Sequence, residues 1–138
     1  MNRLSKVLAC TTLLVAASCG GGDSTAPGTA SIAGSYALQT VNGASLPFVV
    51  LQIGGDKIEV IDETVTLSAG DAFTQQGSLR ITQGGLVSID NYAEAGVYTR
   101  DGTALNFVFS SDGTTGTGTI SGNTLIVAVS GLSLVYRK

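Results

Sequence analysis

The stretch NTLIVAVSGLSLVYRK, residues 123–138, alternates apolar and other residues with a period of two on either side of a Ser-Gly break. Its alternating apolar positions are Leu125, Val127, Val129, Leu132, Leu134 and Tyr136. Successive side chains of a strand point to opposite faces, so strict alternation indicates strands with one buried face. We therefore predict two strands, at 123–130 and 132–138, joined by a tight turn.

The same period runs back to residue 34, and no stretch has the 3.6-residue period of a long amphipathic helix. Asn-Gly and Asp-Gly pairs, such as Asn42-Gly43 and Asp101-Gly102, supply the positive φ of hairpin turns. We predict further strands at 34–41, 47–53, 57–68, 72–82, 86–91, 96–100, 104–110 and 115–121. Consecutive hairpins favour an all-β, up-and-down antiparallel barrel of about eight to ten short strands, because closure removes exposed edges. A β-sandwich is the next alternative.

The N-terminus has the features of an export signal. Arg3 and Lys6 precede a mostly apolar run, 7–17, which is much shorter than the ~20 residues that a membrane-spanning helix needs. A basic start, a short apolar run and small residues before a cleavage point are typical of a signal peptide. We assign residues 1–18 to the signal, residues 19–31 to a flexible Gly/Ser/Thr/Pro tether, and residues 32–138 to the barrel domain.

The end of this signal, Ala16-Ala17-Ser18-Cys19, resembles the lipobox of bacterial lipoproteins, although Ala16 stands where Leu is usual. The resemblance implies that the Cys19 thiol is acylated, with palmitate for example, and that the signal is then removed. Gly20 after the cysteine points to the outer membrane of a two-membrane bacterium. The alternative is ordinary cleavage, which leaves a free thiol. Cys10 is rejected because too few apolar residues precede it.

Composition excludes several classes of function. Without Arg3 and Lys6 the remaining chain has 5 basic and 10 acidic side chains, a net charge of −5, which makes nucleic acid an unsuitable partner. The chain has no His and no spare Cys, so the common metal and haem ligand sets and the His-dependent catalytic triads are unavailable. We therefore expect no cofactor, no metal, no internal disulfide and no enzymatic activity.

Two stretches resemble lipocalin-like (calycin-type) barrels. IAGSYALQTVNGASLP, residues 32–47, is similar to their opening, with Gly34 and Tyr36 in the places of a Gly-x-Trp, and SLVYRK, residues 133–138, is similar to their closing strand. The resemblance implies that a basic residue, Arg137 or Arg100, covers Tyr36 at the closed end. META-type envelope domains open similarly and stay an alternative. A transmembrane barrel is disfavoured, because eight aromatic residues are few for two interfacial girdles.

The candidate site is the barrel interior. The aromatic residues expected to line a pocket for a small apolar or amphipathic ligand are Tyr36, Phe73, Phe107, Phe109 and Tyr136. Gln75, Tyr98 and Asn106 are candidate polar contacts. An eight-stranded barrel is also narrow enough for its own side chains to fill, so the alternative is a structural or interaction domain of the envelope with no small ligand. Asp62, Glu59 and Glu63 are expected on the solvated surface, with Glu59 and Glu63 sharing a face.

Overall fold

The computed structural model describes residues 30–138, and every regular element in that range is a β-strand. The strands are β1 (Gly34–Val41), β2 (Ala44–Ser45), β3 (Phe48–Ile53), β4 (Asp56–Leu67), β5 (Ala72–Gln83), β6 (Leu86–Asp101), β7 (Ala104–Phe109), β8 (Thr115–Ser121), β9 (Thr124–Val129) and β10 (Leu132–Arg137). No helix among the described residues has the length and hydropathy of a membrane span.

The sheet closes through β1. Strands β4 to β10 pair antiparallel in sequence order, and β1 pairs with β10 along one edge and with β4 along the other. The closing pairs with β4 include Tyr36 with Val65, and those with β10 include Leu38 with Tyr136. This gives a closed barrel of β1 and β4–β10, with β2 and β3 as appendages. The predicted fold class, an antiparallel up-and-down barrel, is confirmed.

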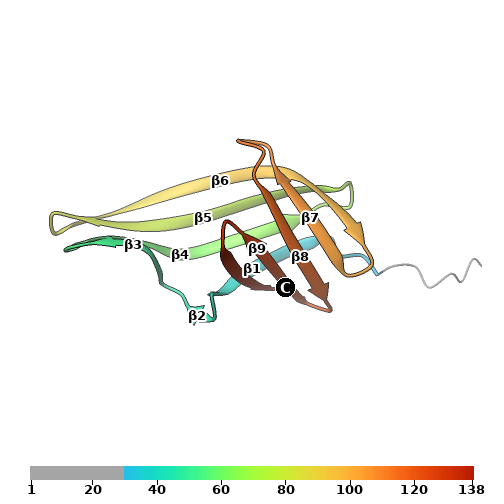
Figure 1. The fold of residues 1–138 in the computed structure, drawn as a ribbon, viewed down its shortest axis with the longest axis horizontal. Helices are drawn as coiled ribbons and strands as arrows, with labels where there is room; N and C mark the ends of the chain where they lie inside the picture. The colour runs from blue at the N-terminus through green and yellow to red at the C-terminus, as the bar shows by residue number, and fades with distance from the viewer. Residues whose placement is uncertain (1–29) are drawn as a thin grey trace, which may run out of the picture.

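Three strands are much longer than the barrel requires. β4 and β5 have 12 residues and β6 has 16, whereas β1 has 8 and β7, β9 and β10 have 6. β1 covers β4 only at 64–67, and β7 covers β6 only at 96–101. The outer parts of the long strands, together with β3, project from the barrel as a four-stranded sheet (Figure 1). We call this sheet, residues 48–62 and 78–91, the arm.

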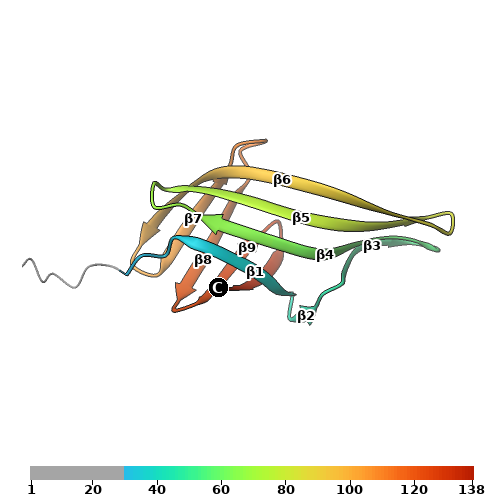
Figure 2. The ribbon, with the colours of Figure 1, turned by 180° about the vertical axis from the view of Figure 1, so that it is seen from behind.

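The view from behind shows the same arrangement, with the arm and the N-terminal end of β1 on opposite sides of the barrel (Figure 2). The predicted ranges 57–68 and 72–82 match β4 and β5 to within one residue. The split between 86–91 and 96–100 was wrong, because residues 92–95 stay in register with 74–77 of β5 and keep β6 continuous. The two-residue β2, beside β1, was not predicted.

The end of the barrel near residue 30 is closed by polar contacts. The Tyr36 hydroxyl donates to the Ile32 carbonyl at 2.6 Å, and the Arg100 guanidinium donates to the Ala30 carbonyl at 2.9 Å. The ammonium of Lys138 lies 5.4 Å from the centre of the Tyr36 ring and donates to the Ala33 carbonyl. The residue that covers Tyr36 is therefore Lys138, not Arg137. Arg137 is exposed because it follows the inward-pointing Tyr136 in the strand.

Candidate functional site

The five aromatic residues predicted from the sequence all point into the barrel. Tyr36, Phe73, Phe107 and Tyr136 are at most 2% exposed, and Phe109 packs against the same core from the rim. The rings of Phe107 and Phe109 stand edge-on to the Phe73 ring, at centroid distances of 5.3 Å and 5.1 Å. Edge-to-face pairs at this spacing are favourable, so the rings hold one another in place.

Two inward-facing glycines make room for these rings. A Cβ at Gly96 would lie 2.6 Å from Cε1 of Phe73, and one at Gly118 would lie 2.9 Å from Cε2 of Phe107. Each ring therefore occupies the volume that a side chain on a neighbouring strand would need. The remaining cavity between these rings, Val127 and Tyr136 measures about 10 Å³, about the minimum for one water molecule. The interior is filled in this conformation.

A buried carboxylate lies where the barrel meets the arm. Glu63 is 7% exposed, and its two carboxylate oxygens accept hydrogen bonds from the hydroxyls of Tyr92 and Tyr136. Glu63, Gly77 and Tyr92 form one cross-strand row, so the Tyr92 ring must cross β5 to reach the carboxylate. A Cβ at Gly77 would lie 2.5 Å from the Tyr92 hydroxyl oxygen, so glycine leaves the space for this contact.

Burial, together with the neighbouring Glu63, raises the pKa of both Tyr92 and Tyr136 above the usual value of 10. Both tyrosines therefore stay neutral and act as hydrogen-bond donors at physiological pH. Because the pKa of each tyrosine is higher in the folded than in the unfolded chain, each contributes stability below about pH 10. This stability is lost as the pH rises above about 10. The cluster stabilises the base of the arm, because it joins β4, β6 and β10 through one carboxylate.

A β-bulge in β4 separates the two glutamates. The register with β5 shifts between Val60 and Asp62, so Glu59 pairs with Arg80 whereas Glu63 pairs with Gly77. The extra residue places Glu59 on the outer face and Glu63 on the inner face, because each one-residue shift reverses the side-chain direction. The predictions that they share a face and are solvated were both wrong, since Glu59 is only 4% exposed.

Glu59 is held by two basic residues on the outer face of the arm. Its carboxylate lies 2.7 Å from Nε of Arg80 and 3.1 Å from Nζ of Lys57. The hydrogen bonds from Arg80 and then Lys57 lower the pKa of Glu59 to about 2, from an ordinary 4.5. This ion cluster therefore contributes stability above pH 4.5 and loses it as the pH falls toward 2.

The mouth of the barrel on the arm side forms a shallow cup of about 370 Å³. Its floor is apolar, with Phe109, Val129, Leu132 and Leu134, and its rim is polar, with Gln75, Tyr92, Glu94, Ser111, Asp112, Thr114 and Ser130. The mouth of a β-barrel is a common place for small-molecule sites, and an apolar floor below polar groups suits an amphipathic molecule. Sequence reasoning missed the cup, because its lining comes from β5, β6, β7, β9, β10 and two turns, which only the closed barrel brings together.

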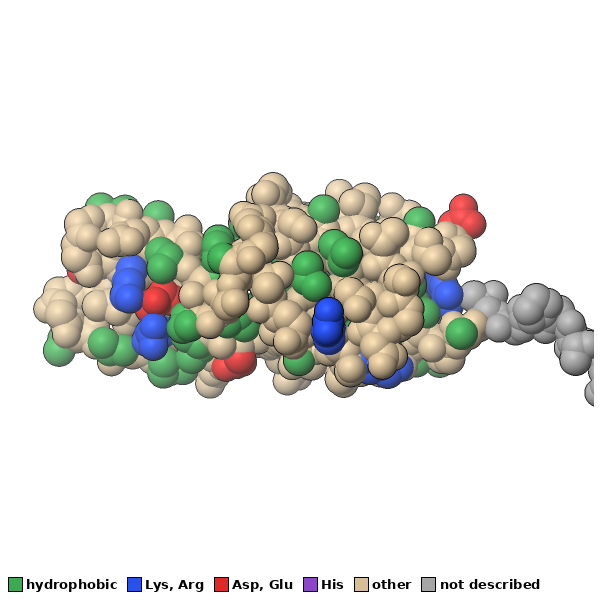
Figure 3. Space-filling model, turned by 90° about the horizontal axis from the view of Figure 1, so that it is seen from below, with side chains coloured by type: hydrophobic (Ala, Val, Ile, Leu, Met, Phe, Trp, Pro, Cys, Tyr) green, Lys and Arg blue, Asp and Glu red, His purple; other side chains and the backbone are tan. Residues whose placement is uncertain are grey.

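Most of the exposed large hydrophobic residues among residues 30–138 lie on the arm. Ten large hydrophobic residues are exposed. Seven of them belong to the arm, namely Val49, Val50, Leu51, Ile53, Leu86, Val87 and Ile89. Leu86 is 80% and Ile53 is 70% exposed. Figure 3 shows hydrophobic side chains at the arm end of the molecule, around a group of basic and acidic ones, and further hydrophobic side chains over the barrel. By the strand register, Leu51, Ile53 and Leu86 lie on one face of the arm and Val87 and Ile89 on the other, so both faces present exposed apolar side chains that another molecule could contact.

The remaining sequence predictions fall in three places. Cys19, the signal and most of the tether lie outside the described residues. Gln75 lines the small interior cavity and Tyr98 is buried with its hydroxyl bonded to the Ser68 carbonyl, whereas Asn106 is exposed. Within residues 30–138 no group of three or more Asp, Glu, His or Cys side chains is placed to hold a metal ion.

No protein-family model matches the sequence, and no curated protein matches it either. Among solved structures, the fold is similar to that of a crystallised variant of the fluorescent protein UnaG. The two chains are 16% identical, the alignment covers 78% of this chain and 95% of that one, and the TM-score is 0.34. A likeness of this size carries no information about what this chain binds.

The filled interior makes a specific prediction for Phe107→Trp. The larger ring has no free space beside Gly118, so we expect overpacking that lowers the free energy of unfolding by about 1–3 kcal/mol, measured by urea denaturation. We also expect the unsubstituted protein to bind no apolar fluorescent probe inside the barrel. A wild type that binds such a probe, together with a Phe107→Trp variant that is stable but binds it more weakly, would contradict the filled interior.

Proposed function

We propose that the chain is a non-catalytic, lipid-anchored protein of the bacterial cell envelope that acts through its arm as an interaction domain. The observation that carries the proposal is the contrast between the two parts of the fold. The cavity between the aromatic rings inside the barrel measures only about 10 Å³, whereas seven of the ten exposed large hydrophobic residues of the described chain lie on the arm. A filled barrel suits a rigid support for a contact surface.

The anchor is proposed from the sequence. The short apolar run ending in Ala17-Ser18-Cys19 supports acylation at Cys19, and Gly20 supports the outer membrane as the destination. A tether of 11 residues between Cys19 and Ser31 reaches roughly 20 Å, because Gly/Ser-rich segments behave as flexible coils of about 5–6 Å × √n. The N-terminal end of β1 and the arm lie at opposite ends of the barrel (Figure 1), so anchoring through the segment before β1 leaves the arm accessible.

The barrel mouth supports a second candidate function, the binding of a small amphipathic molecule. The cup of about 370 Å³ is within the ordinary size range of ligand pockets, and its apolar floor lies below a polar rim. Neither Lys nor Arg lines the cup, whereas Glu94 and Asp112 do. A neutral or cationic head group therefore fits the rim better than a carboxylate or phosphate does.

Anchoring is tested by metabolic labelling with a fatty-acid analogue in a bacterial host. We expect the full chain to be labelled and Cys19→Ala to lose the label, because the acyl chains attach to that thiol. Cys10→Ala, in the apolar run of the signal, is the matched control and should label normally. Label retained in Cys19→Ala, or lost only in Cys10→Ala, would contradict the assignment.

The interaction role is tested by a photo-reactive amino acid placed singly at Ile53 or Leu86 on the arm, or at Val97 or Ile126 on the barrel wall. All four positions are exposed, between 42% and 80%. We expect covalent protein adducts in intact cells from the two arm positions and few from the two barrel positions. Equal yields from arm and barrel, or no adducts from the arm, would overturn the proposal.

A further inference from the structure

The arm has two unpaired strand edges. Within the described residues β3 pairs with β4 alone, and β6 pairs with β5 but meets β7 only from Gly96 onward. The outer backbone groups of β3 and of residues 86–94 in β6 therefore have no neighbouring strand. An unpaired edge with exposed apolar side chains favours the addition of another strand, because that strand satisfies the edge N–H and C=O groups.

The two edges differ in charge. The free part of β6 contains Asp90 and Glu94, and charged residues on an edge discourage pairing with another chain. β3 contains none, and the whole segment 44–55 is uncharged. In a chain that is otherwise acidic, β3 is the edge that a copy of itself approaches without placing like charges opposite each other.

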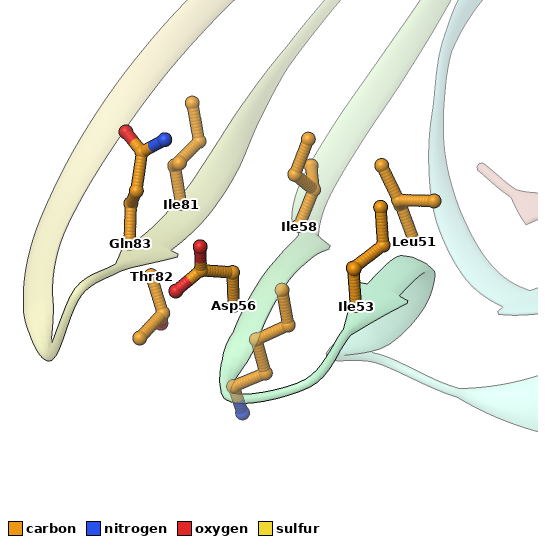
Figure 4. Close-up of a pocket in the computed structure, with 8 residues that line it drawn as sticks. Leu51, Ile53, Asp56, Ile58, Ile81, Thr82 and Gln83 are labelled. Atoms are coloured by element: carbon orange, nitrogen blue, oxygen red, sulfur yellow. The ribbon is translucent and has the colours of Figure 1, made fainter.

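The geometry of β3 locates the contact. Its register with β4 shifts between Val49 and Leu51, so a bulge at Val50 bends the first half of the strand, while 51–53 pairs regularly with 56–58. Leu51 and Ile53 point to the same side of the sheet as Ile58 and Ile81, and Thr82 points to the other (Figure 4). Leu51, Ile53, Ile58 and Ile81 form the apolar part of a groove of about 250 Å³, which is also lined by Asp56, Lys57, Thr82 and Gln83.

We propose that the partner of this edge is the β3 strand of a second copy, paired antiparallel about a two-fold axis at Gln52. This inference rests on the proposed interaction role of the arm. Gln52 then lies opposite Gln52 of the second copy, and Leu51 lies opposite its Ile53. The alternating Leu51 and Ile53 of each copy extend the apolar row of the other. A contact of this kind is self-complementary, so it closes as a dimer and does not propagate into a fibre.

The contact is small. Three regular residue pairs with their flanking side chains cover less than the ~800 Å² per partner of a standard stable interface, so we expect weak association in dilute solution. Confinement of two anchored copies to one membrane raises their effective concentration and favours the pair. The anchor and the edge therefore act together, and the dimer is expected on the membrane.

The test is the formation of a disulfide between the Gln52→Cys residues of two copies, which face each other across the axis. The full chain is expressed in a bacterial host, whose envelope is oxidising. Because Cys19 is acylated under the proposed function, Gln52→Cys supplies the reactive thiol, and we expect a dimer on a non-reducing gel that a reductant dissociates. The matched controls are Gln76→Cys, on the exposed outer face of β5, and Leu86→Cys, on the edge of β6. Both are expected to stay monomeric. A Gln52→Cys chain that dimerises no more than Gln76→Cys overturns the inference.

A charge exchange at the same position checks that the contact is symmetric. When both copies carry Gln52→Lys, or both carry Gln52→Glu, like charges lie opposite each other at the axis. Two differently tagged copies of the same variant should then no longer co-purify from crosslinked membranes, whereas copies of the unsubstituted chain should. Co-expression of the two variants should restore co-purification, whereas the same exchange at Gln76 should have no effect. Arm adducts with a different protein and no Gln52→Cys dimer would refute the self-pairing and leave the interaction role standing. The absence of any arm adduct would remove both.

Discussion

The fold depends on how β1 closes the barrel, because β1 joins the short strand β10 to the much longer strand β4. β1 has 8 residues and pairs with β10 along one edge and with only four residues of β4 along the other. This closure buries the inner ends of the long strands β4, β5 and β6 and leaves their outer ends outside the barrel, paired with one another and with β3. The arm is therefore a consequence of the closure, because the short strands of the barrel pair with only part of the length of β4 and β6.

Inside the barrel, aromatic side chains of one strand occupy the space that glycines of another strand leave free. Phe73 lies over Gly96, Phe107 over Gly118 and Tyr92 over Gly77, so large and small residues alternate around a narrow barrel. The same packing brings the Tyr92 hydroxyl to Glu63 and secures the base of the arm. The interior thus serves mainly to hold the ring closed and the arm in place, and the surfaces open to other molecules are the mouth and the arm.

Most of the strands and turns could be predicted from the sequence, because period-two alternation and Asn-Gly or Asp-Gly turns are local signals. The inward direction of Phe73 and Phe107 followed from the same parity. The bulge at Ile61 could not be predicted, since nothing local marks the extra residue, and it reversed the expected relation between Glu59 and Glu63. The continuity of β6 through 92–95 depends on pairing with β5, which is a non-local interaction.

Native-state hydrogen exchange of the Cys19→Ala chain, at a concentration too low for association, tests the central claim that a closed, filled barrel carries a separately stabilised arm. Amides in β9, β10 and residues 64–67 of β4 should exchange only through global unfolding, because these paired strands enclose the buried core. Amides of the arm near Ile58 and Ile81 are also paired on both sides, but they lie outside the core, so they should exchange faster, through local opening. Equal protection in arm and barrel, or rapid exchange where β1 meets β4 and β10, would contradict the account.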